Sequence, residues 1–196
     1  ILGKRRRNNT QQPPMNIKKL SYDTLSVYLA AIQDIDRSRR ERERKTVAAL
    51  ARHALSDCGE LCHLPSGAPY VSNVEASISI SHSRQTAALA VGLPGQSIGV
   101  DIESPREQLL NVAARVLSER ELAIYGSDLH GLLAAWTLKE ATYKAAGVPG
   151  LDFRRDILLP DAPDAGASVC ADGRIFKIAT CTEIDGEWLS LVYLPV

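Results

Sequence analysis

The chain has 196 residues, which is long enough to bury a substantial core as one domain or as two small halves packed together. Hydrophobic residues make up 45% and charged residues 23% of the sequence, as in an ordinary water-soluble globular protein. The formal net charge is zero, which excludes a protein that binds polyanions through its overall charge. No apolar run approaches the roughly 20 residues of a membrane-spanning helix, so we expect no membrane partner.

Residues 1–14 precede the only methionine, Met15, and are rich in basic and polar side chains. We expect this segment to be an upstream or vector-derived leader that is disordered and takes no part in the fold. Its basic run KRRR at 4–7 is a pattern that can bind nucleic acid, but a solvated leader is the simpler interpretation. We therefore expect no nucleic-acid partner.

The four cysteines indicate reduced thiols. Cys58 and Cys62 are poorly placed to pair with each other, and together with Cys170 and Cys181 they lack the tight paired spacing of a zinc site. The basic start is followed by no apolar segment of the kind found in a secretory signal. We therefore expect free thiols and a cytoplasmic location.

Apolar residues at helical spacing predict two helices early in the chain. The first covers residues 22–36 and would be capped by Ser21 or Asp23. The second covers residues 38–57, with a charged first part and a buried apolar stripe in its second part. A charge run of this kind usually forms a solvated face, and the alternative is that its arginines point at an anionic ligand.

Alternating apolar and polar residues predict strands in the middle of the chain. A loop over 58–67 leads into the turn SGAP at 66–69, and strands follow at 76–80 and 86–92 as a hairpin. A third strand covers residues 97–103.

Side chains alternate along this third strand, so that Asp101 and Glu103 project from one face beside Gly99. The opposite face is apolar and suits the core: Ile98, Val100 and Ile102. Two carboxylates on one face of a strand repel each other, so they favour either a neighbouring cation or a fully solvated edge.

Helices return in the second half of the chain. Ser118 and Glu121 form a capping-box pattern that opens a short helix ending near Tyr125. A long helix follows over 129–146, and Gly147 is the expected residue at its end. The tail after it reads as a three-stranded antiparallel meander with Asp-Gly turns.

This order of elements predicts an α+β fold. We expect two similar halves, residues 15–97 and 98–196, each with a long helix packed on a three-stranded antiparallel sheet. The C-terminal half would carry the functional site.

Three carboxylates and a lysine form that candidate site. Glu140 and Lys144 are neighbours on one stripe of the long helix, where the ordinary alternative is a surface ion pair. With Asp101 and Glu103, Glu140 would supply three oxygen donors, which suit magnesium bound to a substrate phosphate. Lys144 would neutralise or protonate a leaving phosphate oxygen. His82, at a strand end between two serines, would hydrogen-bond an anion, although a lone histidine is more often structural.

Three ordered motifs resemble the signature of the 4′-phosphopantetheinyl transferases: SISHS at 79–83, IGVDIE at 98–103 and WTLKEATYK at 136–144. The resemblance is to the longer, pseudo-dimeric type that activates many carrier proteins, and it covers roughly residues 67–147. Its order and spacing are specific, whereas the N-terminal region and the tail match only in general pattern.

The resemblance implies an enzyme that transfers the 4′-phosphopantetheine group of coenzyme A to a serine of an apo acyl, peptidyl or polyketide carrier protein. The by-product would be adenosine 3′,5′-bisphosphate. Magnesium would be the cofactor, and the chain would be a monomer with internal pseudo-two-fold symmetry. The alternative is a coenzyme A or carrier-protein binding module without catalysis, although a pure binder has no need for three convergent acids.

The resemblance also implies roles for single residues. Asp101, Glu103 and Glu140 would hold magnesium against the pyrophosphate. Glu140 would be the general base for the serine, directly or through a water. Lys144 would assist the leaving group, and Lys139 would contact phosphate.

Four further residues would hold coenzyme A, the first two at its 3′-phosphate end and the last two beside its adenine: Ser81, His82, Gly67 and Pro69. Many relatives carry a basic residue where this chain has Ala68. Either Arg52 or Arg44 would replace that contact, or the adenine side would be looser. Val116 and Leu117 stand where an aromatic pair is common, which affects packing more than chemistry.

Overall fold

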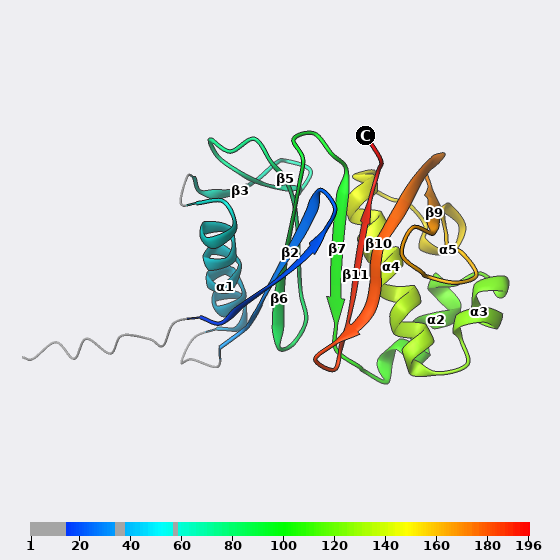
Figure 1. Cartoon of the computed structure of the whole chain (residues 1–196). Coiled ribbons are helices and arrows are strands. Elements are labelled where there is room, and N and C mark those ends of the chain that lie inside the picture. Colours follow the sequence, from blue (N-terminus) through cyan, green and yellow to red (C-terminus); the bar gives the residue numbers. More distant parts are fainter. Residues whose placement is uncertain (1–14, 34–37, 57–58) are drawn as a thin grey trace, which may run out of the picture.

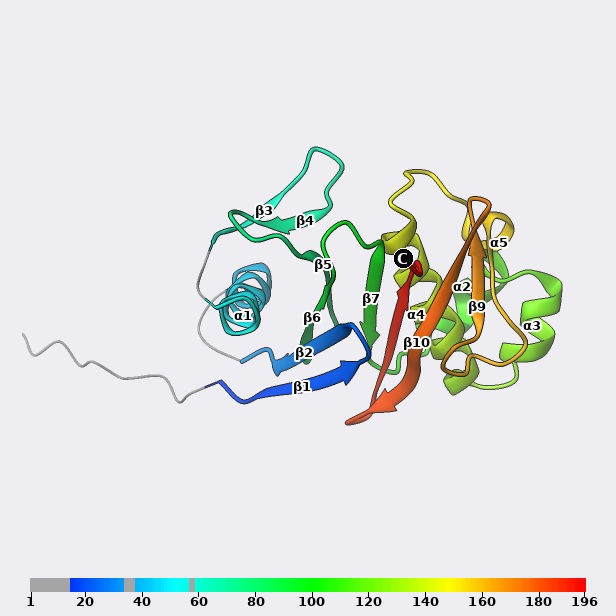
Figure 2. The same ribbon diagram turned by 45° about the horizontal axis from the view of Figure 1, so that its top comes forward.

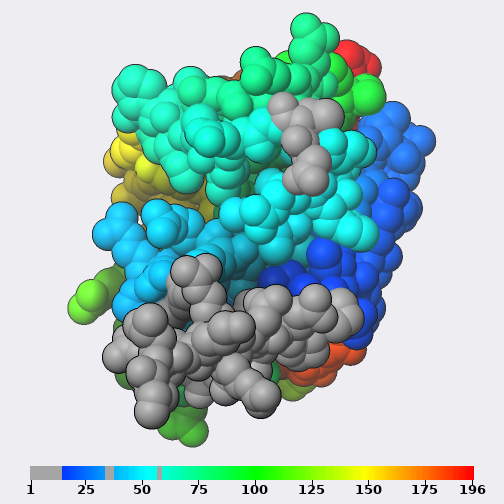
Figure 3. All heavy atoms as spheres, turned by 90° about the vertical axis from the view of Figure 1, so that its left-hand side faces the viewer, coloured from blue at the N-terminus to red at the C-terminus, as the bar shows by residue number. Residues whose placement is uncertain are grey.

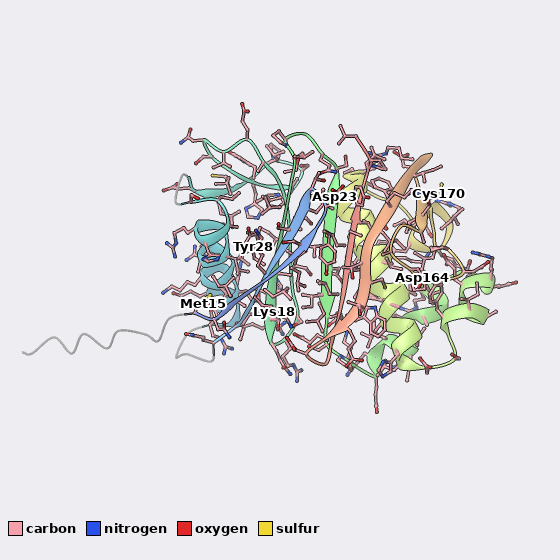
Figure 4. The ribbon with its side chains drawn as sticks, in the orientation of Figure 1. Met15, Lys18, Asp23, Tyr28, Asp164 and Cys170 are labelled. Carbon is pink, nitrogen blue, oxygen red and sulfur yellow. The ribbon has the colours of Figure 1, made fainter. Side chains whose placement is uncertain are left out.

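The structure is a computed structural model, and it describes residues 15–33, 38–56 and 59–196. Met15 begins the described chain (Figure 4). The leader with its basic run lies outside the described residues, as do Cys58 and the end of each of the two early predicted helices.

Two antiparallel sheets form the centre of the molecule (Figure 1). The first sheet contains, in spatial order, β1 (Ile17–Tyr22), β2 (Leu25–Ala31), β6 (Thr86–Gly92) and β5 (Ser77–His82). The second contains β7 (Ile98–Glu103), β11 (Glu187–Tyr193), β10 (Arg174–Ile184), β9 (Ser168–Ala171) and β8 (Ile157–Leu158). A separate two-stranded ribbon pairs β3 (Leu61–His63) with β4 (Pro69–Val71) and stands at the top of Figure 2.

Helices cover the outer faces of the two sheets (Figure 1). On one side is α1 (Arg39–Ala54), and on the other are α2 (Gln108–Val116), α3 (Glu119–Tyr125), α4 (Leu129–Ala146) and the short α5 (Phe153–Asp156). The result is a layered helix–sheet–sheet–helix arrangement. No helix in the described part of the chain is both long and apolar enough to cross a membrane.

Three apolar clusters fill the spaces between these layers. Val47 and Leu50 of α1 pack on Leu89 of the first sheet. Between the sheets, Val27 of β2 belongs to the same cluster as Val100 of β7. On the far side, a large cluster lies between α4 and the second sheet. Burial of this apolar surface is the main favourable term that holds the layers together.

The predicted helix over 22–36 is wrong where the structure describes it. Residues 22–31 belong to the β1–β2 hairpin, which turns at Asp23, a residue with a positive φ of 49° (Figure 4). Strand β2 is covered on both faces, by α1 on one side and by the second sheet on the other. Such a strand needs apolar residues at nearly every position, so alternation is lost and helical spacing arises by coincidence.

Most other predicted elements are confirmed. Ser38 caps α1 by accepting a hydrogen bond from the backbone N–H of Glu41, and α3 opens with the complete Ser118–Glu121 capping box. Gly147 ends α4 in the left-handed conformation, with φ of 63°. The hairpin β5–β6, the strand β7 and the meander β9–β10–β11 lie where the pattern placed them.

The α+β class is confirmed, but the sheets are larger than predicted. They have four and five strands instead of three, because β1 and β2 extend the first sheet while β7 and β8 flank the meander in the second. The predicted loop before the SGAP turn contains the strand β3. Three short elements had no clear sequence signal: α2, α5 and β8. The pseudo-symmetry of the two halves stays a prediction.

Candidate active site

Strand β7 and helix α4 come into direct backbone contact at Gly99. A Cβ atom built on this glycine would lie 1.9 Å from the carbonyl oxygen of Ala141 and 2.8 Å from the backbone nitrogen of Ala145. Only glycine permits such an approach without a shift of the helix. Gly99, Asp101 and the next alternate residue share the strand face that meets α4, so this contact brings the acids of β7 beside the helix.

Asp101 and Lys144 form the centre of the site. The Lys144 Nζ lies 2.7 Å from Asp101 Oδ1 and also donates to the carbonyl oxygen of Val100 at 3.0 Å. The hydroxyl of Ser81 donates to the same Oδ1 at 2.6 Å. Asp101 is only 6% exposed, so its charge is compensated by these two donors within a largely buried setting.

Glu140 is the least compensated of the three acids. Burial raises the pKa of its carboxyl, and the negative charges of Asp101 and Glu103 raise it further, while Lys144 and Arg106 oppose them. No side chain in the described part of the chain donates a hydrogen bond to Glu140. A half-buried carboxylate in this state suits either proton transfer near neutral pH or a cation that has yet to bind.

Glu103 is held by a residue that the sequence interpretation missed. Arg106 forms an ion pair with Glu103 at 2.8 Å, and its guanidinium lies 5.8 Å from the ring centre of Trp136 on α4. Burial raises the pKa of Glu103, Arg106 lowers it, and Asp101 raises it. Arg106 lies three residues after Glu103, the last residue of β7, and just before α2. This short spacing between an acid and a base is the sequence signal that could have predicted the ion pair.

The charges of Asp101 and Glu103 raise the pKa of Glu140, and the charge of Asp101 raises the pKa of Glu103. The three acids are therefore close enough to repel one another. Among the residues the structure describes, no three His, Cys, Asp or Glu side chains are grouped as a ready-made metal site. The donor chemistry nevertheless fits magnesium, which prefers carboxylate oxygens and keeps other positions for water and phosphate. The ligand set stays a prediction.

Two cavities reach this group of residues. The first, of about 380 Å³, is lined by Gly67 and Pro69 of the SGAP turn and by Tyr143 and Lys144 of α4. The segment that carries the turn lies close to the end of α4 in Figure 3, above the yellow surface. The structure thus brings the predicted adenine-side turn and the predicted leaving-group lysine to one cavity.

The second cavity, of about 710 Å³, is rich in basic side chains. It is lined by His82 and Glu103 and by three arginines from different segments: Arg39, Arg84 and Arg106. The His82 Nε2 lies 3.6 Å from a carboxylate oxygen of Glu43 on α1. His82 lines this cavity and its side chain is 44% exposed. Its contact with the 3′-phosphate end of coenzyme A stays a prediction.

Lys139 does not face the site, and the predicted phosphate contact is wrong for this structure. Its side chain is completely buried and its Nζ donates to Glu121 at 2.9 Å and to the carbonyl oxygens of Phe153 and Ile157, both at 2.6 Å. All three donors of the ammonium group are thereby used. Burial lowers the pKa of Lys139, and Glu121 opposes that shift. The ion pair of Lys139 with Glu121 joins α4 to α3, and the bonds of Lys139 to Phe153 and Ile157 join both helices to the segment that leads into β8.

Arg44 and Arg52 lie on the exposed surface of α1 and line neither cavity described above. The arginine of α1 that does reach a cavity is Arg39, at the first turn of the helix. The cysteines Cys62, Cys170 and Cys181 are free thiols, as predicted; Cys170 lies on β9 (Figure 4).

Comparison with known protein families gives a match in the second half of the chain. Residues 97–189 match the family model of the 4′-phosphopantetheinyl transferase superfamily. No curated protein matches the chain closely enough to count. The matched segment begins just before β7 and contains all of α4, so it includes the contact at Gly99 and the four charged residues Asp101, Glu103, Glu140 and Lys144. Over residues 97–189 this chain is therefore similar to the 4′-phosphopantetheinyl transferase superfamily.

Proposed function

We propose that this protein is a magnesium-dependent 4′-phosphopantetheinyl transferase. The serine hydroxyl of an apo carrier protein would attack the phosphorus that bears the pantetheine arm of coenzyme A. A new bond forms between the serine oxygen and this phosphorus, and the bond to the bridging pyrophosphate oxygen breaks. Adenosine 3′,5′-bisphosphate leaves with the bridging oxygen, and the serine proton passes to a base.

The observation that carries the proposal is the pairing of Lys144 with Asp101 beside the incompletely compensated acids Glu140 and Glu103. An ordinary surface ion pair would have neither the burial nor the like-charge neighbours found here. Clustered carboxylates with raised pKa values are typical of sites that bind a divalent cation or move a proton.

The residues would divide the work as follows. Asp101, Glu103 and Glu140 would hold Mg²⁺, which supplies a Lewis acid and a template for the pyrophosphate when bound. Glu140 would accept the serine proton, directly or through a water, and its raised pKa makes it a stronger base than an exposed glutamate. Lys144, which lines the first cavity, would stabilise negative charge on the leaving oxygen.

The two cavities would receive the parts of coenzyme A. Gly67 and Pro69 would bound the adenine side in the first cavity, and His82 would contact the 3′-phosphate from the second. The arginines of the second cavity add positive charge in a region where a phosphate-bearing ligand must lie. Because both sheets come from one chain, with the second beginning at Ile98, we propose that a monomer is sufficient for activity.

The test is to incubate the protein with coenzyme A, Mg²⁺ and a panel of apo acyl, peptidyl and polyketide carrier proteins, and to weigh each carrier. We expect a gain of the phosphopantetheine mass on at least one carrier, lost when Mg²⁺ is removed with a chelator. Glu140→Gln should bind coenzyme A without transferring the arm.

Binding of coenzyme A with no transfer to any carrier by the wild-type protein would instead support a binding module without catalysis. Failure of both binding and transfer would refute the proposed function altogether.

A further inference from the structure

Strand β7 is an edge strand of the second sheet, because it pairs with β11 on one side only. Edge strands leave a row of backbone N–H and C=O groups without a partner strand. Here the free edge of β7 faces β5, which is the edge strand of the first sheet. The two edges do not form a backbone ladder, and the sheets remain separate in their strand order.

Serine hydroxyls take the place of that ladder. The backbone N–H of Val100 donates to Ser79 Oγ at 3.0 Å, and the N–H of Ile102 donates to Ser81 Oγ at 3.3 Å. Both serines are buried. They lie two residues apart on β5, and this spacing matches the two-residue period of the N–H groups that point toward β5 from β7. Each hydroxyl therefore satisfies a buried backbone donor that would otherwise be unpaired.

Ser81 has a second contact that Ser79 lacks. A hydroxyl has one proton to donate, and the Ser81 proton goes to Asp101 Oδ1 at 2.6 Å. The same oxygen accepts from Lys144 at 2.7 Å. The other oxygen of Asp101, Oδ2, accepts no hydrogen bond from the described part of the chain. The carboxylate is thus fixed through one oxygen and open at the other.

We infer that Ser79 and Ser81 form a hydroxyl seam between the two sheets, and that Ser81 is a positioning residue that presents Asp101 Oδ2 to a divalent cation. The hydroxyl seam is independent of the proposed function, whereas the role of Asp101 Oδ2 as a metal ligand rests on the proposed function. The Ser81 hydroxyl proton is committed to Asp101 and the side chain is buried. The 3′-phosphate contact that the family resemblance implied for Ser81 stays a separate prediction.

The seam is tested by amide hydrogen exchange in two matched variants, Ser79→Ala and Ser81→Ala. Each variant removes one acceptor and leaves the other in place. Exchange should become at least about tenfold faster at Val100 alone in Ser79→Ala and at Ile102 alone in Ser81→Ala, since each amide loses its bond to the seam. Unchanged exchange at both amides would overturn the seam.

The positioning role is tested by titrating the same proteins with Mn²⁺ in the presence of coenzyme A and measuring free Mn²⁺ by electron paramagnetic resonance. Removal of a hydrogen bond to a metal ligand typically weakens metal affinity by about 10- to 100-fold, so Ser81→Ala should show a loss in that range. Ser79→Ala should keep the wild-type affinity, and Ser81→Thr, which retains the hydroxyl, should recover most of it.

The two failures are distinguishable. If the wild-type protein binds Mn²⁺ and Ser81→Ala binds it equally well, the positioning role is wrong and the proposed function stands. If the wild-type protein binds no Mn²⁺ and transfers no phosphopantetheine, the proposed function and the role of Oδ2 both fall, while the exchange experiment still decides whether the seam exists.

Discussion

Substitution of Gly99 by alanine should uncouple β7 from α4 without unfolding the protein. The added methyl carbon would lie 1.9 Å from the Ala141 carbonyl oxygen, and ordinary contact begins near 3.4 Å. The helix must therefore withdraw by about 1.5 Å, because the obstacle is backbone and not the end of a flexible side chain.

The expected losses of stability and of kcat follow from the displacement of α4. Overpacking a close-packed interface costs about 1–3 kcal/mol, and each kcal/mol lowers the Tm of a chain of this size by about 2–4 °C. Misplacement of catalytic groups by about 1 Å costs on the order of 100-fold in rate. Since Glu140 and Lys144 lie on the displaced helix, we expect Gly99→Ala to lose about two orders of magnitude in kcat with a modest fall in Tm.

The assay measures phosphopantetheine transfer and thermal unfolding on the same preparation. Gly92→Ala is the matched control, because its added carbon would meet side-chain atoms and no backbone: Gln96 and Leu25 at 2.9 Å and Ile98 of β7 at 3.1 Å. Gly92→Ala should lower the Tm slightly and keep the wild-type kcat. Wild-type kcat and Tm in Gly99→Ala would refute the reasoning from the close backbone contact.

Three further predictions test the charged residues. Lys139→Ala should destabilise the protein by about 3–5 kcal/mol in urea unfolding, because it leaves Glu121 buried without its partner. The double change Lys139→Met with Glu121→Gln should recover part of this loss. Equal stability of the wild type, the single variant and the double variant would contradict a structural role for the Lys139–Glu121 pair. Lys144→Ala should lower kcat by about 10²- to 10³-fold, because the charge on the leaving oxygen loses its stabilising lysine. Lys18→Ala, which removes an exposed ion pair with Asp185, is the control and should leave kcat unchanged. A wild-type rate in Lys144→Ala would contradict the role of Lys144 in stabilising the leaving group. Because the pKa of Glu140 is raised in the folded protein, its contribution to stability is present at low pH and is lost as the pH rises through that value. Mg²⁺ binds the ionised carboxylate, so it should raise the Tm more at about pH 8 than at about pH 5, and this difference should shrink in Glu140→Gln; a pH-independent effect of Mg²⁺ would contradict the prediction.

The sequence predicts elements well where local chemistry determines them. Ser118 and Glu121 place the start of α3, and Gly147 places the end of α4, because caps depend on residues a few positions apart. The alternation in β7 correctly separates an acidic face from an apolar one, since only one face of that strand meets the core between the sheets. These signals are local and survive without knowledge of the tertiary fold.

The failures arise where tertiary contacts override the local pattern. Strand β2 lies between two layers, so its apolar residues carry no period that distinguishes strand from helix. Lys139 and Glu140 are adjacent on α4, yet the helix turns one into a buried core and the other toward the acids of β7. Adjacent charged residues in one motif therefore need not share a function, and only the packing of α3 against α4 reveals which one is structural.

The association of Ser81 with Asp101 could not be inferred from spacing either. The two residues are 20 positions apart and belong to different sheets, and they meet only because the edges of β5 and β7 face each other. A motif comparison alone assigns Ser81 to the ligand, whereas the hydrogen bonds assign its proton to the protein.

The central claim is that acids from β7 and α4 share one divalent ion. The most direct measurement is the anomalous diffraction of a crystal grown with coenzyme A and Mn²⁺. We predict a single strong peak with carboxylate oxygens of Asp101, Glu103 and Glu140 at about 2.0–2.2 Å, the range expected for a small hard cation. A peak bound by other residues, or none at this position in a crystal that contains coenzyme A, would contradict the claim.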